Sequence, residues 1–294
     1  MVIRDVYDPL DSSLWASLCA QWCRRAGQFH PDMVFTSEQY GEAWARALGC
    51  EHVLVDLQRE HVPVSGTAIR ANPVAQWDLL TAAGKEHYAR RVVLVGSEST
   101  GKSTLALHLA QLHGAPCVTE YGRELCEKKL LCATETRHTT ATERERETES
   151  GERGESAVPE YEWTDADFED ILRTQAAREN AAARASPQGL VLCDTNIFAT
   201  LIWYERYMAR PVPAALRAIF DELYVPPALY VLLAVEGSVF VQDGYRDGEA
   251  IRDDMESQFV RALTAQSVPF VRLTGGFAER TSAAEDLIRR RFID

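Results

Sequence analysis

The sequence predicts an α/β protein that contains a parallel sheet with helices on both faces. From residue 90 onward, short apolar runs alternate with segments of helical periodicity, which is typical of successive strand–helix units. The apolar runs are nearly continuous and rich in Val and Leu, as in strands that are buried on both faces. Crossover connections between parallel strands place helices against both sides of such a sheet.

The expected elements follow in chain order. Before residue 90, helical periodicity predicts a helix over 12–27, and apolar runs predict strands over 33–37 and 52–56. Buried strands are expected over 90–96, 115–121, 189–195, 228–235 and 268–276. Helices are expected over 102–114, which ends in glycine, over 165–185, which starts at an aspartate, and over 282–293. The chain turns polar near residues 80–90, which indicates a domain boundary there.

The composition is that of an ordinary globular protein of 294 residues, with 46% hydrophobic and 26% charged residues. The net charge of −13 argues against non-specific binding to nucleic acids or to anionic membranes. No stretch approaches the roughly 18 consecutive apolar residues of a transmembrane helix, and the N-terminus lacks the apolar core of a signal peptide. The seven cysteines include no CxxC pair, so we expect reduced thiols in a cytoplasmic protein.

One segment, at about residues 133–157, consists almost entirely of Thr, Glu, Arg, Ser and Gly. Such a stretch cannot bury enough apolar surface to offset the entropy lost on ordering. We therefore interpret it as a disordered surface insertion. A regulatory or partner-binding segment is the alternative.

A phosphate-binding motif joins the first buried strand to the next helix. The residues Gly96-Ser97-Glu98-Ser99-Thr100-Gly101-Lys102-Ser103 match G-x-x-x-x-G-K-[ST], the Walker A pattern or P-loop. The glycines let successive backbone N–H groups point at phosphate oxygens, and the helix N-terminus adds a favourable dipole. Lys102 is placed to bridge the β- and γ-phosphates, and the Ser103 hydroxyl to bind Mg²⁺. We expect the loop and the following Thr104 to bind ATP.

The residues around this motif favour a transferase over other P-loop classes. Asp194 ends the strand at 189–195 and is a natural Mg²⁺ ligand, as in the Walker B position. The next residue is Thr195, whereas hydrolytic motors commonly place a water-activating glutamate there. No N-K-x-D motif is present, which weakens a GTPase interpretation. A general ATPase remains an alternative that phosphate release without an acceptor would support.

A kinase also needs a carboxylate near the acceptor hydroxyl and cations near the transferred group. Glu120 lies at the carboxyl end of the strand that follows the P-loop helix, which is the edge where open parallel sheets bind ligands. Arg123 follows it closely. Arg246 and Arg252 lie in a polar, glycine-containing segment that is suited to a mobile lid. For each arginine, a surface salt bridge is the alternative.

Seven segments taken together carry a family resemblance. They are MVFTSEQYGEAWARALG, PVSGTAIRANPVAQW, VVLVGSESTGKSTL, TEYGRE, YEWTDADFEDILRTQ, CDTNIFAT and VQDGYR. The chain resembles the bifunctional nicotinamide-mononucleotide adenylyltransferase/ribosylnicotinamide kinase family, the NadR type. The resemblance implies a C-terminal P-loop kinase domain over 88–294, preceded by a partial Rossmann-like nucleotidyltransferase domain over 1–85.

The N-terminal half departs from the family pattern. The family's H-x-G-H stretch, which holds ATP during adenylyl transfer, is absent from this chain. Ser65, Gly66, Thr67 and Arg70 match the family's second nucleotide-binding motif. The resemblance therefore implies little or no adenylyl transfer by this chain alone. A structural remnant, an activity retained with a partner chain, and a start codon placed too late are all compatible with the sequence.

The kinase half implies ATP- and Mg²⁺-dependent phosphorylation of nicotinamide riboside to nicotinamide mononucleotide. Lys102, Asp194, Glu120 and Arg246 are the expected catalytic residues, Ser103 and Asp194 the metal ligands, and Arg252 a nucleotide-binding residue. Candidate substrate residues are Tyr121, Arg123, Trp163, Asp165 and Asn196. Asn196 replaces the second acid of the family's D-T-D, and an amide cannot act as a base.

The chemistry of the substrate fits these residues independently. Nicotinamide riboside carries a pyridinium cation, which aromatic faces attract by about 0.5–2 kcal/mol. Aromatic and acidic residues fall in or beside the motifs. The alternative to an enzyme is a nucleotide sensor that binds ATP and an NAD precursor without turnover, which the partial N-terminal half and Asn196 favour. The sequence does not indicate an oligomeric state.

Overall fold

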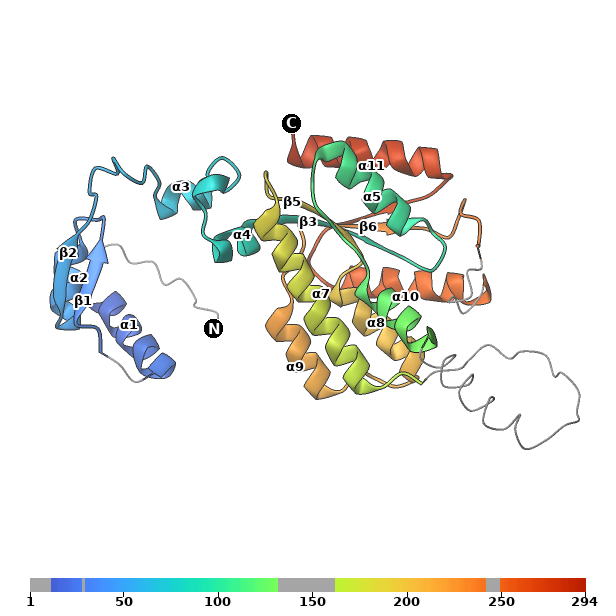
Figure 1. Ribbon diagram of the computed structural model, residues 1–294, viewed down its shortest axis with the longest axis horizontal. Coiled ribbons are helices and arrows are strands. Elements are labelled where there is room, and N and C mark those ends of the chain that lie inside the picture. Colours follow the sequence, from blue (N-terminus) through green and yellow to red (C-terminus); the bar gives the residue numbers. More distant parts are fainter. Residues whose placement is uncertain (1–11, 28–29, 132–161, 242–248) are drawn as a thin grey trace, which may run out of the picture. The chain divides into compact units, whose positions relative to one another are not determined.

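The strand–helix alternation after residue 90 forms a five-stranded parallel sheet in the computed structural model (Figure 1). Its strands are β3 (Arg90–Val95), β4 (Cys117–Val118), β5 (Leu190–Asp194), β6 (Leu229–Leu233) and β7 (Phe270–Leu273). They lie in the order β4-β5-β3-β6-β7, and every neighbouring pair is parallel. The structure describes residues 12–27, 30–131, 162–241 and 249–294. The predicted insertion at 133–157 and Arg246 lie outside these residues.

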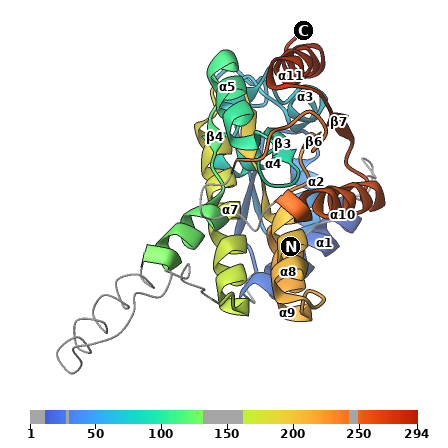
Figure 2. The ribbon, with the colours of Figure 1, turned by 90° about the vertical axis from the view of Figure 1, so that its right-hand side faces the viewer.

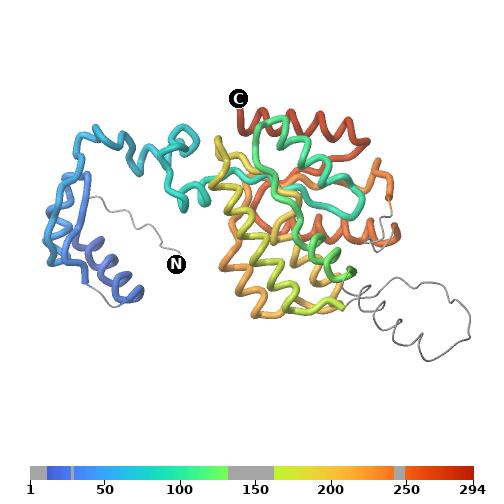
Figure 3. The backbone as a smooth tube through the Cα atoms, viewed as in Figure 1, coloured from blue at the N-terminus to red at the C-terminus, as the bar shows by residue number. Residues whose placement is uncertain are grey.

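Helices cover both faces of this sheet, as the views in Figures 1 and 2 and the backbone trace in Figure 3 show. One face packs against α5 (Lys102–His113) and α11 (Phe277–Phe292), which meet the side chains of Val92, Leu192 and Val231. The other face carries α7 (Asp165–Ala185), α8 (Ile197–Met208), α9 (Ala214–Leu223) and α10 (Arg252–Ala265), which begins after the short 3-10 helix η2 (Glu249–Ile251). Strand residues 92–95 are 0% exposed, so the sheet is the core of this part of the chain. The predicted fold class is confirmed.

The chain divides into two units, Met1–Asn72 and Pro73–Asp294. The first contains α1 (Ser12–Gly27), β1 (Met33–Thr36), α2 (Gly41–Leu48), β2 (Glu51–Leu54) and α3 (Gly66–Ala71). Strands β1 and β2 pair in parallel, with Val34 opposite His52. Val34 packs with Ala16, Ala45 and Leu48 in a small core of its own.

The second unit begins earlier than the polar stretch near residues 80–90 suggested. That stretch forms α4 (Ala82–Tyr88), a surface helix that packs against α7. The 3-10 helix η1 (Trp77–Leu79) precedes it, and Trp77 is only 3% exposed. The Trp77 indole donates a 2.7 Å hydrogen bond to the Ser186 carbonyl, which ties these residues to the sheet domain. The polarity therefore marks a solvated helix rather than a linker.

Several element boundaries differ from the prediction for local reasons. The strand predicted over 115–121 is limited to β4, because the chain becomes helical at residue 121 and remains so to residue 131. Helix α7 has the predicted bounds, but its cap is Thr164, which forms a capping box with Asp167. Helix α11 begins at Phe277, five residues before the expected start, with Glu279 bonded to the Gly276 N–H. No helix in the described ranges has the length and apolar character needed to cross a membrane.

The Trp77 contact gives a test of the domain boundary. We expect Trp77→Ala to lower the free energy of unfolding by about 3–5 kcal/mol, because a large buried ring and a buried hydrogen bond are lost. Urea unfolding followed by circular dichroism measures this. Leu79→Ala in the same turn is the control, since Leu79 is 43% exposed. Equal effects of the two substitutions would contradict the assignment of this turn to the second unit.

Candidate active site

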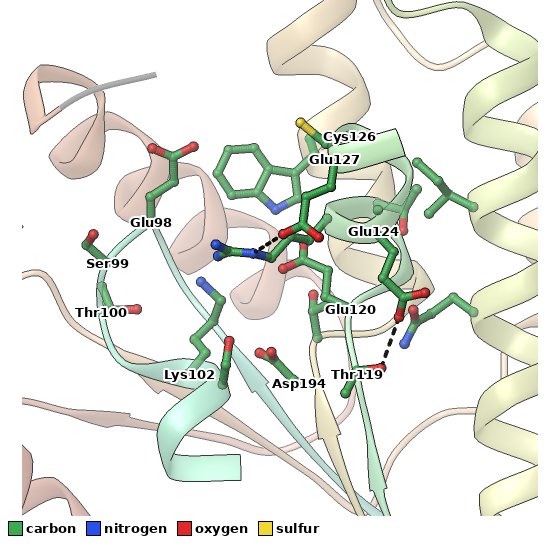
Figure 4. A pocket seen from close by; sticks show the side chains of 18 of the residues that line it. Glu98, Ser99, Thr100, Lys102, Thr119, Glu120, Glu124, Cys126, Glu127 and Asp194 are labelled. Atoms are coloured by element: carbon green, nitrogen blue, oxygen red, sulfur yellow. Dashed lines mark hydrogen bonds and ion pairs between the residues drawn. The ribbon is translucent and has the colours of Figure 1, made fainter. Parts of the chain in front are cut away.

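The P-loop lies at the carboxyl end of β3, in the middle of the sheet. The chain leaves β3 toward β4 and β5 on one side and later returns to β6 and β7 on the other. At such a switch point the connections diverge and leave a crevice above the strand ends. The P-loop and the residues that follow β4 and β5 are therefore brought to one place (Figure 4).

The loop has the backbone geometry that a phosphate cradle requires. Gly96 has φ +139°, and a Cβ there would lie 2.6 Å from the Leu233 carbonyl oxygen. Gly101 has φ +87° at the start of α5, and Ser99 has φ +54°. The Lys102 ammonium donates to the Ser97 carbonyl at 2.8 Å. The loop thus wraps around the first turn of α5, whose free N–H groups and dipole favour an anion.

Two carboxylates from neighbouring strand ends face Lys102. Asp194 is the last residue of β5, and Glu120 follows β4; Figure 4 shows both side chains and Lys102 pointing into the same space. Burial raises the pKa of Glu120 to about 7, and the nearby charge of Asp194 adds to this, while Lys102 and Arg123 oppose it. Glu120 therefore changes its protonation state near neutral pH.

The residues at this edge fit a bound Mg²⁺ ion. Asp194 is 5% exposed, and its Oδ1 atom has no hydrogen-bond partner among the described residues. Ser103 lines the same cavity. The described part of the chain holds no cluster of three or more metal-ligating side chains. In a nucleotide site, phosphates and water supply most of the ligands of Mg²⁺, so Asp194 and Ser103 are enough protein ligands.

A cavity of about 520 Å³ extends from the P-loop past these carboxylates. One part of its lining is aromatic: the Tyr207 ring stacks on Trp163 at 5.6 Å and on Trp203 at 5.8 Å between ring centroids. The acidic lining residues are Glu98, Glu120, Glu124, Glu127 and Asp194, and the basic ones are Lys102 and Arg123. The cavity therefore combines an acidic lining with stacked rings, a combination that suits a flat cationic ligand.

Most of the predicted site residues come together here. The cavity is lined by Glu98, Ser99, Thr100, Gly101, Lys102, Ser103, Thr104, Glu120, Arg123, Trp163 and Asp194. Arg123 pairs with Glu127 at 3.2 Å, on the helical segment 121–131. Gly96 and Ser97 form the base of the loop and are outside this lining.

Four predicted residues lie away from the cavity, each held by another group. The Tyr121 hydroxyl donates to Asp170 at 2.7 Å. Asp165 accepts hydrogen bonds from Tyr204 and Arg210, both at 2.7 Å, and these lower its pKa. Asn196 is 1% exposed and donates to the Tyr230 hydroxyl at 3.1 Å. Arg252 is 2% exposed and donates to the Glu98 carbonyl at 3.1 Å.

The placement of Arg252 corrects the expectation of a lid arginine. Arg252 is the first residue of α10 and packs behind the P-loop, so it is not free to close over phosphates. Asn196 is buried and bonded to Tyr230 of β6, so it lies outside the lining of the cavity. Both side chains are buried in the folded protein, and the sequence alone does not reveal this burial.

Other lining residues were not predicted. Glu124 forms a two-point ion pair with Arg178 of α7, one contact being 2.8 Å. Tyr207 lies one helical turn after Trp203 on α8. The four-residue spacing of these two aromatics is a signal that could have indicated a shared helix face. Glu124 lies in the TEYGRE segment next to Arg123, but its ion pair could not be predicted, because Arg178 is 54 residues away in sequence.

The comparisons with known proteins agree with this geometry. The family described as AAA domain matches residues 91–280. The "Trifunctional NAD biosynthesis/regulator protein NadR" of Escherichia coli (strain K12) is 26% identical over 263 residues, which cover 88% of this chain and 56% of that protein. The protein of the same name from Salmonella typhimurium (strain LT2) is 26% identical over 244 residues, 82% of this chain and 52% of the relative. The chain spans about half the length of the curated relatives it matches.

Two solved structures share the fold. A NadR protein in complex with NAD and AMP-PNP gives a TM-score of 0.54 at 19% identity, covering 98% of this chain and 75% of that chain. A NadR protein in complex with NR gives a TM-score of 0.56 at 21% identity, covering 96% of this chain and 75% of that chain. The match over more than half of the sequence shows that the chain belongs to the AAA domain family, and the chain is similar to NadR proteins in sequence and in fold.

Proposed function

We propose that this chain is a P-loop kinase that transfers the γ-phosphoryl group of ATP to the 5′-hydroxyl of nicotinamide riboside in NAD biosynthesis. One observation carries the proposal: a single cavity joins the P-loop and Asp194 to an acidic, aromatic-lined space. A triphosphate fits the first part, and a cationic nucleoside fits the second.

The phosphate end of the cavity supports ATP as the donor. The amides of residues 98–103 and the α5 N-terminus would hold the β- and γ-phosphates. Lys102 would exchange its contact with the Ser97 carbonyl for charged phosphate oxygens, which are stronger acceptors. Ser103 and Asp194 would hold Mg²⁺, which neutralises charge on the phosphates when bound.

The carboxylates support transfer to a hydroxyl. Glu120 lies beside Asp194 and Lys102, where the acceptor oxygen must approach the γ-phosphorus. As the bond from the acceptor oxygen to phosphorus forms and the bond to the leaving ADP oxygen breaks, the hydroxyl proton passes to a carboxylate. Glu120 is suited to accept it because its pKa of about 7 is near the operating pH.

The acceptor end of the cavity supports a pyridinium nucleoside. The stacked rings of Trp163, Tyr207 and Trp203 offer π faces. Carboxylates outnumber cations in the lining, although Glu124 and Glu127 are paired with Arg178 and Arg123. The relatives add support, because their name refers to NAD biosynthesis and one solved NadR structure is a complex with NR. A neutral nucleoside would gain less from the same surroundings.

The test is mass spectrometry of the products from purified protein with ATP, Mg²⁺ and nicotinamide riboside. Parallel reactions contain uridine, nicotinamide mononucleotide or no acceptor. We expect nicotinamide mononucleotide from the riboside and at least tenfold less product from uridine. ATP binding without product would favour the sensor. NAD from the mononucleotide would assign adenylyl transfer to this chain, and phosphate release without acceptor would indicate an ATPase.

Lys102→Ala tests the phosphate end. We expect at least a thousandfold loss of transfer, because the ammonium that meets charge developing on the γ-phosphate is removed. Unfolding temperature and circular dichroism check that the variant folds. Lys85→Ala is the matched control, because Lys85 lies on α4 and stacks over Trp77 instead of lining the cavity. Full activity of a folded Lys102→Ala protein would contradict the assignment of Lys102 as a catalytic residue.

The protonation of Glu120 predicts a pH dependence. Its carboxylate must be ionised to accept the hydroxyl proton, so kcat/KM for ATP should fall about tenfold per pH unit below pH 7 and level off above it. Glu120→Gln removes this titration. The variant should be slow at every pH, and its kcat/KM should no longer fall below pH 7. If the fall in kcat/KM below pH 7 persists unchanged in Glu120→Gln, a group other than Glu120 accepts the proton.

The position of Asn196 predicts a small effect from restoring the family's acid. In Asn196→Asp the Tyr230 hydroxyl can donate to the new carboxylate, and Tyr224 lies 3.1 Å from Tyr230 to complete the chain of hydrogen bonds. We expect kcat/KM to change by less than about threefold, since the side chain does not face the cavity. Steady-state kinetics measures this, and a rise of tenfold or more would show that Asn196 limits catalysis.

A further inference from the structure

Two buried arginines from the last helices of the chain lie behind the P-loop. Arg252 begins α10 and is 2% exposed; Arg280 lies in α11 and is 3% exposed. Buried guanidinium groups usually pair with carboxylates. Within the described residues, the hydrogen-bond acceptors of both arginines are carbonyl oxygens and the Ser238 hydroxyl.

The two side chains bond to three consecutive carbonyl groups of the loop. Arg252 donates from Nε to the Glu98 carbonyl at 3.1 Å and from Nη2 to the Ser99 carbonyl at 3.4 Å. Arg280 donates from Nη1 to the Thr100 carbonyl at 2.9 Å. The carbonyl before these, on Ser97, is held by Lys102 and the Thr100 hydroxyl. Each peptide from residue 97 to 101 therefore has its oxygen fixed.

Fixing a carbonyl also fixes an amide. In a planar trans peptide the C=O of one residue and the N–H of the next point in opposite directions. Holding the oxygens of Glu98, Ser99 and Thr100 away from the cavity therefore turns the next three N–H groups, up to that of Gly101, away from the arginines. These are the amides that a P-loop offers to phosphate oxygens.

The backbone needs this support because part of it is strained. Ser99 has φ +54°, a region that costs a non-glycine residue free energy and persists only where the surroundings hold it. The Ser99 hydroxyl is itself bonded to the Val241 backbone at 3.0 Å. Arg280 also donates from Nη2 to the Ala234 carbonyl at 2.8 Å and to the Glu236 carbonyl at 2.6 Å, so it ties the loop to the end of β6.

We propose that Arg252 and Arg280 are positioning residues that set the amides of the P-loop for phosphate before any nucleotide binds. They act through the loop backbone and do not touch the phosphates. When either arginine side chain is removed, the peptides of the loop are free to rotate and the affinity for phosphate falls. The acceptor end of the cavity is unchanged. This role concerns any nucleotide in the P-loop and does not depend on the acceptor.

The test is isothermal titration of the full chain with ADP and Mg²⁺, without acceptor. Arg252→Met and Arg280→Met keep the apolar bulk of the side chain and remove the donors. We expect the Kd for ADP to rise at least tenfold in each. The controls are Arg261→Met on α10 and Arg290→Met on α11, because both residues are exposed; they should stay within twofold.

A lysine series and kinetics separate positioning from a general loss of structure. Arg252→Lys and Arg280→Lys keep charge and a single donor group, so they should recover at least threefold of the lost affinity. With a working acceptor, the KM for ATP should rise tenfold while the KM for the acceptor stays within twofold. Where a methionine variant does not fold, the lysine variant decides, with an expected rise in Kd of about threefold. Folded variants that bind ADP within twofold of the unaltered protein would overturn the proposal.

Discussion

The carbonyl oxygens of the P-loop constrain the structure around the site. A loop whose N–H groups converge on one point must turn its carbonyl groups the other way, and each of these needs a donor. Here the donors are Lys102, Thr100 and the two arginines Arg252 and Arg280. Helices α10 and α11 are therefore part of the proposed phosphate site, although they follow it by about 150 residues or more in the sequence. The sheet order brings them there, because β6 pairs with β3 and β7 pairs with β6.

The distribution of charge in the cavity explains how an acidic chain can hold a polyanion and favour a cation. The positive groups are concentrated at the P-loop, where Lys102 and the α5 N-terminus lie and two guanidinium groups stand behind the loop. The carboxylates lie on the other side of Lys102, and their mutual repulsion and burial are reflected in the raised pKa of Glu120. A cation next to these carboxylates reduces the repulsion, so the same field that disfavours a second anion would favour the pyridinium ring of the proposed substrate.

The parts of this protein that could be predicted from the sequence are those with a local pattern. The P-loop has fixed spacing, and Asp194 and Glu120 could be placed because carboxyl ends of parallel strands meet at one edge. Arg280 could not be found, because a buried arginine in a helix of alternating charge looks like a surface residue until α11 is packed. Arg252 was selected for its position in a polar segment, but a residue pattern does not show that a helix starts there and buries it. Asn196 was selected from the family motif, and its inward orientation depends on Tyr230 of β6, two strands away in the sheet.

The N-terminal unit offers less for catalysis than the second unit does. In the described residues its sheet is the pair β1–β2, and Phe35 and Leu54 on these strands are 66% and 50% exposed. Parallel sheets are ordinarily covered on both faces, whereas side chains on β1 and β2 are open to solvent. Ser65, which matches the family's second nucleotide motif, already accepts the Ala68 N–H at 3.0 Å as the cap of α3. Its hydroxyl can still donate, but one donor at the start of a six-residue helix does not make a nucleotide site. The chemistry is therefore assigned to the P-loop unit, where a cradle, two carboxylates and an aromatic-lined cavity meet.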